Sequence, residues 1–216
     1  MTTKRIFVTA TNTDVGKTFI SEKLVNLFSD MGLRVSYLKP IETGVSQFPL
    51  DGKKVFDVAK ERNPELERFS LTEIVPYQFR LPASPFVAKG ETEIKLSKIV
   101  ESLEKLEKVS DIVIIEGAGG TAVPISENYF TTDLIADLGA KAVLVAPTNL
   151  GSISDTLLSI WKLESEKIDF IWTLNLWKDK NSFDEVSLPF YKSHFKEVDI
   201  FQKNPQKLAE KILNLF

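Results

Sequence analysis

Two short runs of the chain, residues 112–115 and 142–145, consist only of aliphatic side chains. A strand that is apolar without alternation is buried on both faces, which is typical of a parallel sheet covered by helices on each side. Parallel strands also need long crossover connections, usually helical ones. The sequence therefore predicts an α/β fold in which a mainly parallel sheet lies between two layers of helices.

The rest of the chain fits this alternation of strands and helices. The predicted strands cover residues 6–9, 34–39, 112–115, 142–145, 170–174 and 198–201. The predicted helices cover residues 18–31, 55–62, 96–109, 132–138, 154–164 and 186–195, and a last helix opens at Asn204 and Pro205. Residues 63–90 are expected to be irregular. Ligands bind beyond the carboxyl ends of such strands, so one rim should carry the loops 10–18, 39–52, 116–131, 146–153 and 175–184.

Composition narrows the class of protein. The chain has 216 residues, for which one domain covering 1–216 is expected. Its 27 basic and 30 acidic residues give a net charge of −3, whereas nucleic-acid binders usually have a basic surplus. The absence of cysteine excludes disulfides and thiolate chemistry, and a single histidine, His194, excludes a multi-histidine metal site. We expect His194 on a helix surface, and Trp161 and Trp172 in the core.

The sequence gives no sign of a membrane protein. No run approaches the roughly 20 apolar residues of a membrane span. The apolar part of residues 1–8 is too short for a signal peptide. We therefore expect no membrane association and a cytoplasmic location.

The strongest local motif is the segment 10–18, which reads ATNTDVGKT between a predicted strand and a predicted helix. Backbone N–H groups and a helix N-terminus bind phosphate in this setting. Gly16 would let the backbone approach, Lys17 would reach the β and γ phosphates, and Thr18 would place its hydroxyl on Mg²⁺. Thr11 replaces the usual first glycine, so an ordinary strand–turn–helix corner is the alternative. The residues expected around a nucleotide are Thr13, Asp14, Val15, Gly16, Lys17, Thr18 and Phe19.

An acid follows the buried run 112–115 at the predicted rim. Glu116 is placed there to hold Mg²⁺ with its carboxylate, although a solvated acid is the alternative interpretation. The small residues after it allow close approach to a phosphate or a substrate. These residues are Gly117, Ala118 and Gly119.

A lysine ends the second predicted strand at the same rim. Lys39 would add positive charge beside the phosphates, or else extend along the surface into solvent. Asp57 lies in a charged helix where acids are plentiful, so the sequence alone favours no special role for it. The loop of Asn149, Leu150, Gly151 and Ser152 precedes a helix and would either bind a carboxylate or form a plain turn.

These residues together make the chain similar to the dethiobiotin synthetases, ATP-dependent enzymes of biotin synthesis. The resemblance runs in order through most of the chain, up to about Asn175. It rests on residues 11–18 (TNTDVGKT), 39–44 (KPIETG), 76–79 (PYQF), 82–85 (PASP), 116–120 (EGAGG), 150–153 (LGSI) and Asn175. Each block is short, but the combination is specific.

The resemblance implies a P-loop NTPase fold with a mostly parallel, seven-stranded sheet, and a homodimer as the active form. It implies 7,8-diaminononanoate, CO₂ and ATP as substrates and Mg²⁺ as cofactor. One amine would form a carbamate with CO₂, and ATP would phosphorylate the carbamate to a mixed anhydride. The second amine would then close a cyclic urea and expel phosphate.

The resemblance also implies roles for individual residues. Lys17 and Lys39 would be catalytic, attending the γ-phosphate and the carbamate. Mg²⁺ would be held by Thr18, Asp57 and Glu116. The diamine would contact Lys39, Thr43 and Ser84, and its carboxylate would bind the 149–152 loop of the partner subunit. Adenine would contact Asn175. Trp177 would either stack on the base or be a loop residue without a functional role.

The chain departs from the family pattern at Ala10, Thr43 and Leu176, and in a short stretch after residue 198. Adenine selectivity is therefore the least constrained expectation. The main rival is a P-loop partitioning or scaffold ATPase, but such proteins carry a lysine where Asn12 stands. A cobyrinate-type amide synthetase would need a catalytic cysteine. A non-catalytic nucleotide-binding module would leave Lys39 and Glu116 without a task.

Overall fold

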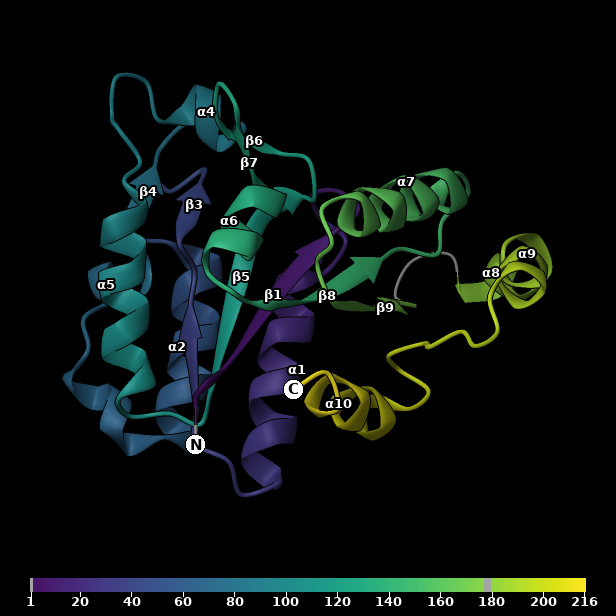
Figure 1. Ribbon diagram of the computed structural model, residues 1–216, viewed down its shortest axis with the longest axis horizontal. Helices are drawn as coiled ribbons and strands as arrows, with labels where there is room; N and C mark the ends of the chain where they lie inside the picture. Colours follow the sequence, from purple (N-terminus) through teal and green to yellow (C-terminus); the bar gives the residue numbers. More distant parts are fainter. Residues whose placement is uncertain (1, 177–179) are drawn as a thin grey trace.

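The computed structural model describes residues 2–176 and 180–216. Its centre is a sheet in the strand order β2-β5-β1-β8-β9, in which every neighbouring pair is parallel (Figure 1). The strands are β1 (Lys4–Ala10), β2 (Val35–Leu38), β5 (Ile112–Gly120), β8 (Lys141–Ala146) and β9 (Phe170–Leu174). The two unbroken apolar runs lie fully buried in β5 and β8, as predicted. The α/β class is confirmed.

Crossover connections between the parallel strands place helices on both faces of this sheet. On one face, α1 (Lys17–Asp30) packs beside α2 (Leu50–Arg62) and α10 (Pro205–Leu213). On the other, α5 (Leu96–Glu107), α6 (Thr131–Asp137) and α7 (Ser152–Ser165) cover β2, β5 and β8. Two helices, α8 (Lys180–Val186) and α9 (Leu188–His194), follow β9. Helix α10 begins as predicted, because the Asn204 side chain accepts a hydrogen bond from the Lys207 backbone.

The expected seven-stranded sheet has five strands within the described residues. The chain leaves the sheet at Pro40, which has no N–H to continue the ladder. It then forms a separate parallel pair of β3 (Ile41–Thr43) and β4 (Tyr77–Phe79), while β6 (Pro124–Ser126) pairs antiparallel with β7 (Tyr129–Phe130). The strand predicted at 198–201 is a single parallel bridge from Ile200 to Leu174 at the edge of β9.

The segments predicted as loop or irregular contain short ordered elements. Residues 39–52 hold β3 and the first turn of α2, which begins earlier than predicted. Residues 63–90 hold a 3₁₀ helix (Pro64–Arg68), α3 (Leu71–Ile74), β4 and α4 (Pro85–Ala88). Elements this short contain too few residues to display a period, so the sequence pattern did not reveal them. In Figure 1, α4, β3, β4, β6 and β7 gather at the upper end of the molecule.

The core extends from the sheet to the last helix. One hydrophobic cluster includes Ile6 of β1 together with Leu208 and Ile212 of α10. Trp172 is partly buried and packs against this cluster, as predicted. The prediction for Trp161 is wrong, because it lies on the outer side of α7 and is 54% exposed. His194 is exposed on α9 as expected, and its ring stacks on Phe190.

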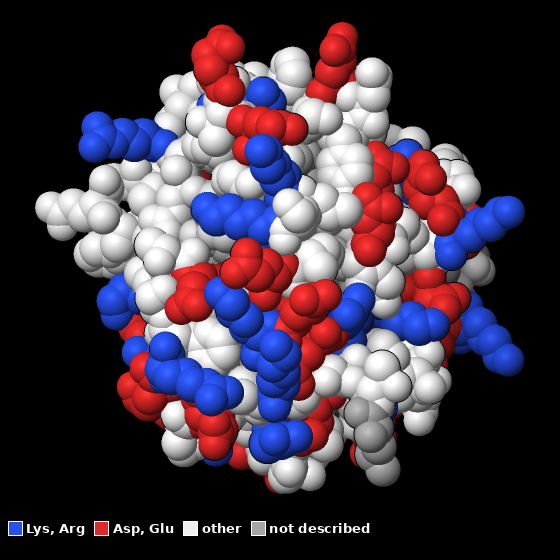
Figure 2. All heavy atoms as spheres, turned by 60° about the vertical axis from the view of Figure 1, so that its left-hand side comes forward, with Lys and Arg blue, Asp and Glu red and all other residues white. Residues whose placement is uncertain are grey.

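Surface charge is mixed in sign. Figure 2 shows Lys and Arg interspersed with Asp and Glu across the face that it presents. Several surface charges of the protein pair, including Arg34 with Asp111 at 2.7 Å and Lys105 with Glu101 at 2.9 Å. This face therefore has none of the single-sign character that marks a nucleic-acid surface. Within residues 2–176 and 180–216, no helix combines the length and apolar character needed to cross a bilayer.

Candidate active site

A tight loop joins β1 to α1 at the rim where the parallel strands end. Gly16 has φ +99°, and Asp14 also adopts a positive φ, of +56°. A Cβ on Gly16 would collide with the side-chain amide of Asn175, so only glycine fits this position. The Lys17 ammonium folds back and donates to the Asn12 carbonyl at 3.1 Å. The loop thus wraps around the lysine in front of the N-terminus of α1, as a phosphate-binding loop does.

The side chain of Asn175 supports this loop through a hydrogen bond to its backbone. Its amide Nδ2 donates to the Val15 carbonyl at 2.7 Å, and its Oδ1 accepts from Gln202 at 2.5 Å. Gln202 also accepts from the Leu176 backbone at 2.8 Å. Asn175 is buried and both ends of its amide are engaged, so in this structure it braces the loop. Contact with adenine stays a prediction, and Trp177 lies outside the described residues.

A cavity of about 830 Å³ opens in front of the loop. Most of the residues predicted for the site line it. These are Thr13, Asp14, Gly16, Lys17, Thr18, Lys39, Thr43, Ser84, Gly117, Ala118 and Gly119. Val15 is a buried residue of the loop itself. Phe19 packs edge-on against Phe201, with 5.9 Å between the ring centroids. The structure thus brings the phosphate-loop residues and the proposed diamine contacts into one space.

A buried ion pair lies at the cavity: Lys39 lines it, and Glu116 lies directly behind the lining. The Lys39 ammonium lies 2.6 Å from Glu116 Oε1, and the Thr18 hydroxyl donates to the same oxygen at 2.8 Å. Both charged groups are closed off from water, at 4% and 0% exposure. Lys39 follows β2 and Glu116 lies in the adjacent β5, in which Ile115 pairs with Leu38. Parallel pairing therefore brings the two side chains together.

Burial and charge oppose each other in this cluster. Burial alone would raise the pKa of Glu116, but the Lys39 ammonium and the donated hydrogen bonds hold it below its usual value. Burial alone would lower the pKa of Lys39, but the negative charge of Glu116 holds it above its usual value. Both groups are therefore ionised at neutral pH. Lys17 has no such close partner, and burial, with the positive charge of Lys39, lowers its pKa to about 8.

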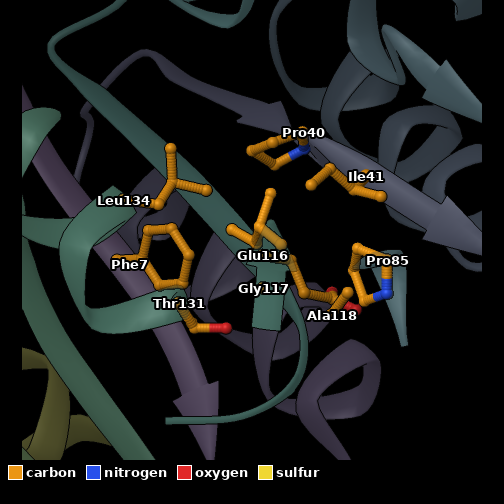
Figure 3. Close-up of a pocket in the computed structure, with 10 residues that line it drawn as sticks. Phe7, Pro40, Ile41, Pro85, Glu116, Gly117, Ala118, Thr131 and Leu134 are labelled. Atoms are coloured by element: carbon orange, nitrogen blue, oxygen red, sulfur yellow. The ribbon is translucent and has the colours of Figure 1, made fainter. Parts of the chain in front are cut away.

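The space behind Glu116 is apolar. Figure 3 shows Phe7 and Leu134 on one side of Glu116 and Gly117, with Pro40, Ile41 and Pro85 on the other. Side chains of this kind exclude water and lower the local dielectric. The charges of Lys39 and Glu116 therefore interact more strongly than they would at a surface.

An acid that the sequence interpretation missed lies at the cavity. Asp51, in the first turn of α2, lines the cavity with its carboxylate 3.9 Å from the Lys39 ammonium. The buried Glu42 of β3 fixes this turn, because its two oxygens accept from the Asp51 and Gly52 backbone at 3.1 and 2.8 Å. Pro49, at the N-cap position, provides no side-chain acceptor there. Burial also raises the pKa of Glu42, although the nearby Lys39 opposes this.

The structure does not bring Asp57 into the cavity. Its carboxylate pairs with Lys53 and Lys60 on the same helix, and it is absent from the cavity lining. Helix α2 begins at Leu50 rather than at residue 55. Six residues of helix turn the direction of a side chain by about 600°, which is about 120° short of two full turns. Asp51 and Asp57 therefore point about 120° apart and do not share a face. For the acid of this helix, the geometry favours Asp51.

The loop 149–152 lies apart from this cavity in the same subunit. Leu150 is 82% exposed, and the Asn149 amide donates to the Leu150 carbonyl at 3.0 Å. Gly151 has φ +92° at the start of α7, and Ser152 is buried beside Tyr191 with 3.5 Å between their hydroxyls. The role predicted for this loop depends on a second subunit.

The oxygen donors around the cavity fit a hard divalent cation. Thr18 and Asp51 line the cavity with a hydroxyl and a carboxylate, and the carboxylate of Glu116 lies behind the lining, hydrogen-bonded to Thr18. Within the described residues, no group of three or more His, Cys, Asp or Glu side chains is arranged to hold a metal by itself. Proteins commonly bind Mg²⁺ through one or two carboxylates together with substrate phosphates and water, and a Mg²⁺ site here stays a prediction.

Comparison with known proteins identifies the family. A family model described as "AAA domain" matches residues 4–203. ATP-dependent dethiobiotin synthetase BioD of Sulfurovum sp. is 40% identical over 88% of this chain and 90% of its own length. The enzyme of the same name from Wolinella succinogenes is 35% identical over 98% of this chain and 99% of its own length.

The chain belongs to the dethiobiotin synthetase family.

Solved structures add the wider fold. The MinD cell division protein of Aquifex aeolicus has a TM-score of 0.53 at 18% identity, covering 92% of this chain and 80% of that one. A plasmid partition protein of Borrelia burgdorferi has a TM-score of 0.57 at 12% identity, covering 100% of this chain and 98% of that one. At such low identity these likenesses concern the fold alone. They place the chain in the P-loop architecture expected from the motif at residues 10–18.

Lys17 makes the stability of the ligand-free protein depend on pH. Its folded pKa of about 8 lies below the ordinary 10.5, so the charged form is disfavoured in the folded state. The resulting cost is present below pH 8 and is relieved as pH rises, because the unfolded chain then binds more protons. We expect Lys17→Met to be about 1–3 kcal/mol more stable than the wild type at pH 7, with a gap that narrows above pH 8.

Urea denaturation from pH 7 upward measures this gap. Lys23→Met, at a partly exposed lysine on the same helix, reports the general effect of removing one positive charge. A gap between Lys17→Met and the wild type that stays constant across this range would contradict the effect of burial on Lys17.

Proposed function

We propose that this protein closes the cyclic urea ring of dethiobiotin from 7,8-diaminononanoate, CO₂ and ATP. The observation that carries the proposal is the buried pair of Lys39 and Glu116, in which Lys39 lines one cavity together with Lys17 and Thr18. This arrangement gathers positive charge and oxygen donors where a triphosphate and a second anion would meet. Family membership provides the reaction. The whole site lies in what we take to be one domain, because β1 and α10 share a core.

The reaction needs charge stabilisation more than a nucleophilic side chain. One amine of the substrate attacks CO₂ and loses a proton, which gives a carbamate anion. A carbamate oxygen attacks the γ-phosphorus, ADP leaves, and a carbamic–phosphoric anhydride forms. The second amine then attacks the carbamate carbon and phosphate leaves as the ring closes. Each step places negative charge on oxygens that a positively charged, dry site can stabilise.

The residues of the cavity divide this work. Backbone N–H groups of the loop 13–18 bind the phosphates, and Lys17 neutralises the β and γ oxygens. Lys39 lies between the phosphate side and the substrate side, so it stabilises the carbamate and the transferring phosphoryl group. Thr43 and Ser84 line the far part of the cavity, where the diamine would lie. Bound Mg²⁺ would neutralise phosphate charge, held by Thr18, Glu116 and Asp51.

A second copy of the chain would complete the site. Leu150, Leu158 and Trp161 form an exposed apolar face on and before α7, between 54% and 82% exposed. Such a face is typical of a surface covered by another protein. We propose that two copies pair through it, so that the 149–152 loop of each reaches the substrate carboxylate of the other. A cytoplasmic location, where ATP is available, belongs to the same proposal.

The rival function is a partitioning or scaffold ATPase that uses nucleotide hydrolysis as a switch. The solved structures with this fold include a cell division protein and a plasmid partition protein. Against this rival, the sequence has Asn12 where a partitioning ATPase is expected to carry an additional lysine. The cavity here also extends from the phosphate loop past Lys39 to Thr43 and Ser84, which gives room for a small substrate.

An assay with ATP, Mg²⁺, bicarbonate and the diamine tests the reaction. We expect phosphate release that depends on the diamine and yields the cyclic urea. Lys39→Ala should lower kcat by about 10²–10³-fold with little change in ATP affinity, since it loses one charge that stabilises the transition state. Lys17→Ala should lower both kcat and the affinity for ATP. Hydrolysis that is indifferent to the diamine would favour the switch ATPase instead.

Asp51 and Asp57 provide a matched pair for the metal. Asp51→Asn should raise the Mg²⁺ concentration needed for half-maximal activity about tenfold, because it removes a carboxylate from the cavity. Asp57→Asn, on the same helix but outside the cavity, should leave it unchanged. Titration of activity with Mg²⁺ at saturating ATP measures both. The opposite ranking would restore the assignment based on sequence alone.

The apolar face predicts the oligomeric state. Trp161→Glu should shift the protein from dimer to monomer in sedimentation analysis, because it places charge in the proposed contact. It should also raise KM for the diamine more than KM for ATP, since only the diamine would bind the loop of the partner subunit. Lys108→Glu, exposed after α5, is the control. A wild-type protein that is monomeric at assay concentrations would refute the shared site.

A further inference from the structure

Tyr37 is a buried polar side chain to which the sequence analysis gave no role. It lies in β2 and, with Tyr191, is one of the two largest fully buried side chains of the described residues. Its hydroxyl donates to Glu116 Oε2 at 3.1 Å. A phenol placed this deep inside a sheet is costly to bury unless its hydroxyl is used. Here the hydroxyl is used on the acid behind the cavity lining.

The two oxygens of Glu116 have different partners. Oε1 accepts from the Lys39 ammonium at 2.6 Å and from the Thr18 hydroxyl at 2.8 Å, and both donors line the cavity. Oε2 accepts from Tyr37, which lies in the core and does not line the cavity. The hydrogen bond from Tyr37 therefore sets the rotation of the carboxylate. One oxygen is kept on the core side and the other on the side of the phosphate loop.

Tyr37 is suited to act as a constant donor. Burial, with the nearby negative charge of Glu116, raises the pKa of its hydroxyl well above the ordinary value. The group therefore stays protonated at physiological pH. It adds no charge of its own, so it orients Glu116 without neutralising it as Lys39 does.

The geometry points to Tyr37 as a positioning residue that aims Glu116 Oε1 at the cation of the nucleotide complex. This inference rests on the proposed function, in which Glu116 and Thr18 hold Mg²⁺. Without the hydroxyl, the carboxylate would be free to turn and share both oxygens with Lys39 and Thr18, the donors on its cavity side. The oxygen meant for the cation would then be less available. Partners that orient metal-binding carboxylates typically contribute tenfold or more to metal affinity.

Calorimetric titration with ATP, once with Mg²⁺ and once with EDTA, tests this inference. The readout is the gain in ATP affinity that Mg²⁺ provides. Tyr37→Phe removes one oxygen atom and should reduce this gain about tenfold, with ATP affinity in EDTA unchanged. In a Glu116→Gln background the same substitution should have no further effect, because it acts through Glu116.

Tyr77→Phe is the matched control. Tyr77 is also buried, and its hydroxyl accepts from the Lys95 backbone at 2.7 Å, away from the cavity lining. Its loss should lower the melting temperature to a similar extent as Tyr37→Phe but leave the Mg²⁺ gain intact.

Several results would overturn the inference. They are an unchanged gain in Tyr37→Phe, an equal loss in Tyr77→Phe, and a further loss in the Glu116→Gln background. These results leave the proposed function standing if the wild type binds ATP more tightly with Mg²⁺. A wild type that shows no such gain would instead refute the proposed Mg²⁺ site and the inference with it.

Discussion

A lysine that follows one strand and a glutamate within the adjacent parallel strand face each other out of contact with water. Taking two charges out of water is costly, and their attraction offsets that cost only when the geometry is close and the remaining lone pairs are used. Lys39 and Glu116 meet this condition at 2.6 Å, and Thr18 and Tyr37 provide the other hydrogen bonds to the carboxylate. Removing one partner of such a pair typically costs about 3–5 kcal/mol, because the other charge remains buried alone. The protein therefore keeps these charges in a fixed arrangement before any ligand arrives.

The surrounding fold holds this arrangement at one rim of the sheet. Parallel pairing brings the ends of β1, β2 and β5 to the same side, which places the phosphate loop, Lys39 and Glu116 together. Distant parts of the chain then stabilise each piece. Asn175 and Gln202 brace the loop from the C-terminal half, and Glu42 holds the first turn of α2. Preorganisation of this kind means that little rearrangement is needed when negative charge develops.

The same sheet serves proteins with different tasks. The solved structures with this architecture include cell division and plasmid partition proteins, so the sheet by itself does not determine the chemistry. The differences lie in side chains on the rim. In this chain Asn12 stands in the loop, and the cavity continues past Lys39 to Thr43 and Ser84. A ligase needs this additional room for a second substrate, whereas a nucleotide switch does not.

Local patterns in the sequence determined the α/β class, the phosphate loop and the position of Lys39 directly after β2, whereas Glu116, predicted to follow a strand that ends at residue 115, lies inside β5. A few adjacent residues are enough to indicate each of these features, for example an unbroken apolar run or a Gly-Lys-Thr triplet. Only the tertiary structure decided that Asp51 rather than Asp57 lies at the cavity, because the start of α2 depends on a glutamate from β3 that no local pattern reveals. It also decided the tasks of Tyr37 and Asn175, whose partners are 79 and 160 residues away along the chain. Contacts across such separations arise only when strands pair and helices pack. A pattern of neighbouring residues therefore does not predict them.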